Sequence, residues 1–135
     1  MNRDVGDIID RWSIAKLKAE RIGTDDNKKE LVAFEEAVTG ICSRFPQYDM
    51  EQFKQMMLDI NSSIWFLESA LKNGKELLPL PFYLDAEENK EILSQIGKNT
   101  ILIRNINHFR VKLKNIINKL TGEGFQDEKS HHMSE

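Results

Sequence analysis

Residues 5–22 read VGDIIDRWSIAKLKAERI, and this stretch decides the fold class. Its apolar residues recur at spacings of three and four, which is the period of one face of an α-helix. They are Val5, Ile8, Trp12, Ala15, Ala19 and Ile22. Asp4 can cap the start of this helix, and Gly23 can end it because glycine readily adopts the left-handed conformation that closes helices. The segment therefore predicts an amphipathic helix that buries one face.

Three further segments show the same period. The predicted helices cover residues 28–45, 50–73 and 85–121, and Gly97 is a candidate bend in the last one. Between the last two, residues 77–84 form an apolar stretch with two prolines, which predicts an ordered loop packed on the helices. The apolar stripes are Leu31, Phe34, Val38, Ile41 and Phe45, then Phe53, Met56, Ile60, Ile64, Leu67 and Leu71, and finally Ile106, Phe109, Leu113, Ile117 and Leu120.

The fold class predicted from these stripes is all-α, with about four amphipathic helices in a mostly antiparallel bundle. A chain of 135 residues can bury one core, so residues 1–125 are expected to form a single domain. Residues 126–135 are polar and have the composition of a C-terminal tail.

The composition of the chain limits which partners and which cellular compartment are expected. The formal net charge is −3, with basic and acidic residues mixed along the chain, which does not favour nucleic-acid binding. Apolar runs are too short to span a membrane, and the start of the chain does not resemble a secretory leader, so a cytoplasmic protein is expected. Cys42 is the single cysteine and lies on an apolar stripe, which predicts a buried, inert thiol.

Polar side chains line the edge of the core on the last predicted helix. Asn107, Arg110, Lys114 and Asn118 are spaced three, four and four residues apart, and therefore share one helix face. They form either a solvated face or a wall that binds an anion, with Arg110 as a planar fork and Lys114 as a point charge.

A second ribbon of polar side chains follows the same rule on the third predicted helix. It consists of Asn61, Trp65, Glu68 and Lys72. Trp65 with its charged neighbours can form the floor of a site for a planar ligand, or simply a cluster on the helix surface. On the first helix, Asp7 and Asp10 lie one turn apart and could bind Mg²⁺ through oxygen; no other cofactor is predicted.

Residues 6–14, GDIIDRWSI, and residues 61–68, NSSIWFLE, resemble the opening and central motifs of a domain-of-unknown-function family of uncharacterised bacterial and phage proteins. The polar ribbon at residues 107–118, followed by residues 127–131, DEKSH, resembles its closing motif. Ser69, Lys72 and His131 depart from the usual acid, Arg and Tyr. The resemblance implies that the ribbons and the tail belong to the family pattern, and it implies no particular activity.

Three functions follow as hypotheses. The first is binding of a small anionic ligand, such as a nucleotide or phosphosugar, in a charged cleft between helices. The second is an interaction module whose ribbons fix helix register or form a homo-oligomer interface. The third is a Mg²⁺-dependent phosphohydrolase that uses Asp7, Asp10 and Glu68 as ligands. Since no phosphate loop, zinc-ligand spacing or nucleophile elbow is found, binding is favoured over catalysis.

Overall fold

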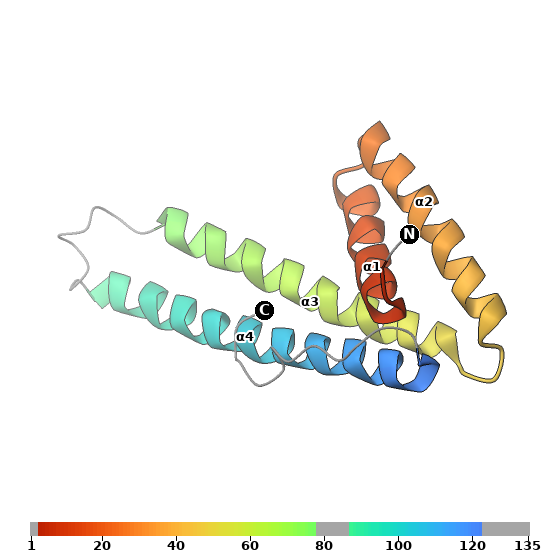
Figure 1. The fold of residues 1–135 in the computed structure, drawn as a ribbon. Helices are drawn as coiled ribbons and strands as arrows, with labels where there is room; N and C mark the ends of the chain where they lie inside the picture. Colours follow the sequence, from red (N-terminus) through yellow and green to blue (C-terminus); the bar gives the residue numbers. More distant parts are fainter. Residues whose placement is uncertain (1–2, 78–86, 123–135) are drawn as a thin grey trace.

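The computed structural model describes residues 3–77 and 87–122, and these residues form four α-helices and no strand (Figure 1). The helices are α1 Val5–Arg21, α2 Asp25–Arg44, α3 Met50–Leu77 and α4 Glu87–Thr121. The prediction of an all-α, four-helix fold is therefore confirmed. Of the proline-containing loop predicted for residues 77–84, Leu77 is the last residue of α3, and residues 78–84 and the polar tail lie outside the described residues.

Side-chain caps start α1 and α2, and a glycine follows the end of α1. The carboxylate of Asp4 accepts a hydrogen bond of 2.7 Å from the Asp7 backbone N–H at the start of α1. Gly23 follows α1 with a φ of 76°, a conformation that glycine adopts without steric penalty. The Thr24 hydroxyl then accepts from the Asn27 N–H at 3.1 Å and starts α2.

Two predicted helix boundaries need correction, and Gly97 does not split the last helix. The Thr24 cap starts α2 at Asp25, ahead of the predicted position 28. Asn73 and Gly74 do not end α3, which continues to Leu77. The last helix runs through Gly97 without interruption, because a glycine weakens a helix by about 1 kcal/mol but keeps every backbone hydrogen bond.

The helices are arranged as two hairpins. Long helices α3 and α4 lie antiparallel side by side, and the shorter α1–α2 hairpin packs at the end where α3 begins and α4 finishes (Figure 1). Helix α1 contacts each of the other three helices. The best-buried large side chains are contributed by α1, α3 and α4: Ile9, Met57 and Ile117. Helix α1 is therefore the central element of the core.

Cys42 lies half-buried at the edge of this core, packed against its buried side chains. Burial raises the pKa of its thiol, and a higher pKa leaves less of the reactive thiolate. In the part of the chain that the structure describes, no helix combines the length and the apolar character that crossing a bilayer requires.

The contact between α1 and α4 depends on a glycine. A Cβ atom on Gly6 would lie 2.6 Å from the Lys114 carbonyl oxygen and 3.0 Å from the Asn118 amide oxygen. The missing side chain lets the two backbones approach, and the Gly6 N–H donates a 2.8 Å hydrogen bond to that Asn118 oxygen. The start of α1 is thus capped by a side chain of α4.

Replacing Gly6 with alanine is expected to lower the free energy of unfolding by about 1–3 kcal/mol, because α1 and α4 must move apart. Gly40→Ala is the matched control: nothing lies within 4 Å of its added Cβ, so the gain in helix propensity should stabilise the protein by about 0.5–1 kcal/mol. Urea denaturation followed by circular dichroism measures both. Equal effects of the two substitutions would show that the close contact is not limiting.

Candidate functional site

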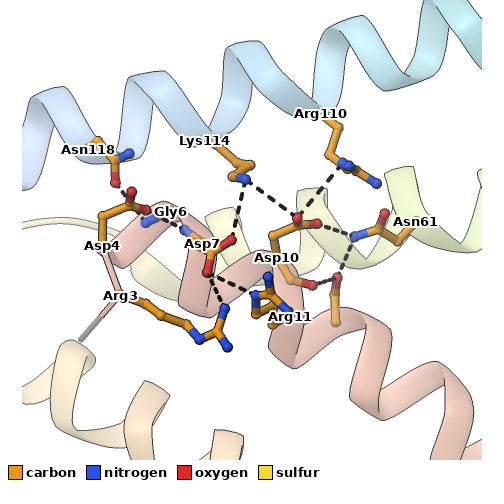
Figure 2. Close-up of polar contacts among 11 residues, drawn as sticks. Arg3, Asp4, Gly6, Asp7, Asp10, Arg11, Asn61, Arg110, Lys114 and Asn118 are labelled. Carbon is orange, nitrogen blue, oxygen red and sulfur yellow. Dashed lines mark hydrogen bonds and ion pairs between the residues drawn. The ribbon is translucent and has the colours of Figure 1, made fainter. Parts of the chain in front are cut away.

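A buried carboxylate, that of Asp10 on α1, is the centre of the polar contacts between helices (Figure 2). The Asn61 amide on α3 donates to Asp10 Oδ1 at 2.8 Å and to the Ser13 hydroxyl at 2.6 Å. Ser13 in turn donates to the Asp10 backbone carbonyl at 2.7 Å. All three side chains are buried. These contacts join α1 to α3 through a connected polar network.

Two cations of α4 face the carboxylates of α1. Lys114 Nζ lies 3.4 Å from Asp7 Oδ1 and 3.9 Å from Asp10 Oδ2, and Arg110 Nε lies 3.8 Å from the same Asp10 oxygen (Figure 2). Asp7 and Asp10 are one turn apart on α1, as are Lys114 and Arg110 on α4. A buried carboxylate is costly unless it is paired, so these cations make the burial of Asp10 tolerable.

The outer carboxylate, Asp7, has further partners in its own helix turn. Its Oδ2 accepts from Arg11 at 2.9 Å and from Arg3 at 3.2 Å. Partial burial by itself would raise the pKa of Asp7. The hydrogen bonds from Arg11 and Arg3 and the charge of Lys114 outweigh this effect and hold the pKa below its ordinary value of 3.8.

A cleft of about 470 Å³ opens beside Arg110, between α1, α3 and α4. Its lining combines apolar side chains with one cation, one carboxylate and two amides. These residues are Ile14, Leu17, Asn61, Ile64, Trp65, Glu68, Asn107 and Arg110. The volume is in the range of sites for small molecules.

The polar groups of the cleft differ in how far the protein already uses them. Arg110 Nε is buried, lies 3.8 Å from Asp10 Oδ2 and has no hydrogen-bond partner among the described residues. Asn61 uses its amide nitrogen on Asp10 and Ser13, and no described residue donates to its oxygen. The Arg21 guanidinium lies 5.5 Å from the Trp65 ring centroid, so a cation stacks on the indole.

The structure places the predicted ligand residues in three different surroundings. Asn61, Trp65, Glu68, Asn107 and Arg110 line the cleft together. Two others serve the α1–α4 contact instead: Lys114 bridges the carboxylates and Asn118 caps Gly6. Lys72 is exposed and does not line the cleft.

The predicted metal ligands Asp7 and Asp10 do point to the same side, where Lys114 lies between them. Glu68 lines the neighbouring cleft and does not join them. Within residues 3–77 and 87–122, no group of three His, Cys, Asp or Glu side chains is arranged to hold a metal ion. A magnesium site at Asp7 and Asp10 therefore stays a prediction that needs Lys114 to move.

Sequence reasoning missed three residues that build this region. Gly6 permits the α1–α4 contact, Ser13 completes the Asp10 network, and Arg21 stacks on Trp65. Ser13 lies three residues after Asp10, a spacing that could have indicated a shared helix face. Nothing local to Gly6 or Arg21 indicates their partners, which lie on other helices.

Comparison of the chain with protein-family models, with curated proteins and with solved structures gives no match.

Asn61→Ala is expected to destabilise the protein by about 2–4 kcal/mol, because it removes the donor to a buried carboxylate. Asn105, exposed on α4, provides the control. Asn105→Ala should change the unfolding free energy by about 0.5 kcal/mol or less, since it alters only helix propensity. Chemical denaturation measures both variants, and a cost for Asn61→Ala no larger than that of the control would contradict the network.

The lowered pKa of Asp7 predicts a pH-dependent contribution to stability. A carboxylate whose pKa is lower in the folded state stabilises the protein above its unfolded pKa, and this stabilisation is lost as the pH falls through the folded pKa. The stability difference between the parent and Asp7→Asn should therefore be full at pH 7 and shrink below pH 3.8. Thermal unfolding between pH 7 and the acid limit of folding measures it. Glu36→Gln, at an exposed position of α2, should show no comparable trend.

Proposed function

We propose that this protein binds a small anionic molecule in the cleft between α1, α3 and α4. The observation that supports the proposal best is the position of Arg110. Its side chain lines the cleft, and its buried Nε, 3.8 Å from Asp10 Oδ2, has no hydrogen-bond partner among the described residues. A guanidinium oriented in this way offers two parallel donors to a carboxylate or phosphate group.

The charges around Arg110 favour an anion. The carboxylates of Asp7 and Asp10 are matched by four cations, Arg3, Arg11, Arg110 and Lys114. Arg110 and Glu68 are the charged residues that line the cleft, and Arg21, whose guanidinium lies 5.5 Å from the Trp65 ring centroid, adds a positive charge beside it. An anionic group beside Arg110 therefore enters a region of positive charge, and Glu68 is left to accept hydrogen bonds from hydroxyl or amino groups of the same ligand.

The remaining lining suits a ligand with a planar or sugar-like part. Ile14, Leu17 and Ile64 supply apolar contacts, and Trp65 supplies an aromatic surface. The amides of Asn61 and Asn107 can orient polar edges. A nucleotide or a phosphosugar combines an anionic group with such a part, and this is the ligand class that we infer.

The same contacts weigh against the alternatives. For a magnesium-dependent phosphohydrolase, Lys114 would have to leave both carboxylates, which already have counter-charges. For a homo-oligomer interface built from the polar ribbons, Lys114 and Asn118 would have to give up their partners on α1 of the same chain. Binding through Arg110 requires neither change.

The test is isothermal titration of the full chain with nucleoside monophosphates, sugar nucleotides and inorganic phosphate, each with and without Mg²⁺. At least one anion should bind, and Arg110→Ala should weaken that binding by at least about tenfold through the loss of charge-assisted hydrogen bonds. Arg110→Lys should restore only part of the affinity, because a point charge cannot form the fork.

Arg104→Ala is the matched control, since Arg104 lies on the same helix but is exposed and outside the cleft. It should bind like the parent, and circular dichroism should show that each variant is folded. Equal affinity of Arg110→Ala and the parent would contradict the proposal, as would the absence of binding across the whole panel.

A further inference from the structure

An apolar groove runs between α3 and α4 on the side of the hairpin away from the Asp10 network. It consists of two adjoining hollows, one beginning at Arg21 and Ser62 and the other continuing along α4. Five large apolar side chains line it and are exposed: Met56, Phe66, Leu102, Phe109 and Ile116. Two of them are phenylalanines with 69% and 59% of their surface accessible.

The exposed area is large for a protein of this size. At roughly 200 Å² for a side chain of this size, exposed fractions of 42–69% give about 500 Å² for the five side chains together. Patches of roughly 300–600 Å² are the largest that monomers usually expose. The value also approaches the roughly 800 Å² that each partner buries in an interface of standard size.

The sequence of α4 explains why the groove has the form of a helix-packing surface. Its apolar residues on this side are spaced four, three, four, three and four apart, which is the heptad pattern of helices that pack at shallow angles. They are Leu102, Ile106, Phe109, Leu113, Ile116 and Leu120. Leu113 is buried against the core, whereas Phe109 and Ile116 remain exposed. The apolar stripe of α4 therefore includes side chains, Phe109 and Ile116, that packing within one chain leaves exposed.

The edges of the groove have opposite charges. Lys112 lines it from α4, with its ammonium 5.8 Å from the Phe109 ring centroid. Asp59 lines it from α3 and accepts a 2.8 Å hydrogen bond from Gln55. Among the described residues neither forms an ion pair. When two copies meet through this face about a two-fold axis parallel to α3 and α4, α4 of one lies along α3 of the other, which brings Lys112 to the level of the partner's Asp59, since both line the same hollow.

We infer that the α3–α4 groove is a homodimer interface, in which the hairpins of two copies pack face to face. The area, the heptad spacing and the self-complementary charges support a second copy as the occupant. Arg21 connects the two regions, since it lines one end of the groove and stacks on Trp65 of the cleft, but the inference of a dimer does not rest on the proposed ligand site.

The oligomeric state tests the inference. Sedimentation equilibrium or light scattering should give twice the chain mass of 15.7 kDa at micromolar concentrations. Phe109→Asp and Phe66→Asp should each raise the dimer Kd on the order of 100-fold, because a charge replaces an apolar side chain at the centre of the interface. A parent that remains monomeric up to the highest measurable concentration overturns the inference, as does a dimer that both variants leave intact.

Val32→Asp is the matched control, since Val32 is an apolar residue on α2 with 58% of its surface accessible and lies outside the groove. It should dimerise like the parent. The orientation is tested by charge reversal: Lys112→Asp alone should weaken the dimer, and adding Asp59→Lys should restore it. Failure of the double variant to recover overturns the two-fold arrangement, and circular dichroism checks that every variant is folded.

Discussion

The burial of the Asp10 carboxylate constrains the arrangement of the helices more than any other contact. A carboxylate removed from water destabilises a fold by several kcal/mol unless hydrogen bonds and opposite charges surround it. In this protein the partners come from two other helices, Asn61 from α3 and Arg110 with Lys114 from α4. Apolar packing alone tolerates small shifts between helices. The polar contacts of Asp10, in contrast, are all formed at only one register of α1 against α3 and α4.

The same constraint accounts for the cleft. Holding α1 against α3 and α4 near Asp10 brings Ile14 and Leu17 opposite Ile64 and Trp65. Arg110 belongs to both regions, since its Nε faces the buried carboxylate and its side chain lines the opening. The stabilising network therefore also orients the group that we propose to bind the ligand. Separating structural from functional roles here requires binding and stability to be measured on the same variants.

Helix α4 has two distinct contact surfaces. One carries the polar side chains that meet α1, and the other carries the heptad-spaced apolar residues of the groove. Helix α1 reaches one hollow of that groove through Arg21, whereas the other hollow is lined by residues of α3 and α4 alone; the α1–α2 hairpin packs at one end of α3 and α4 (Figure 1). A long hairpin covered on one side by a shorter one leaves its other face available, which is the physical basis of the dimer inferred above.

Local chemistry was sufficient to predict the helices. The three-and-four spacing of apolar residues, the Asp4 cap and the Gly23 stop depend on neighbours in sequence, and the structure confirms the helix, its start and its end. The stripes were wrong in part, because Ile22, Met56, Phe109 and Leu120 are exposed. The same spacing also indicated that residues 107–118 present a polar face. It could not say what that face meets, and the alternatives of solvent, an anion or another helix were equally compatible with the pattern.

Only the tertiary structure decided among them, because the partners are more than forty residues apart in sequence and their meeting depends on how the helices cross. Packing assigned Lys114 to the carboxylates, Asn118 to the Gly6 N–H, and left Arg110 facing the cleft. That selection rests on the close backbone approach at Gly6. The sequence by itself determined four amphipathic helices with polar ribbons, and the crossing of α1 over α4 determined which ribbon residues connect the helices and which line the cleft.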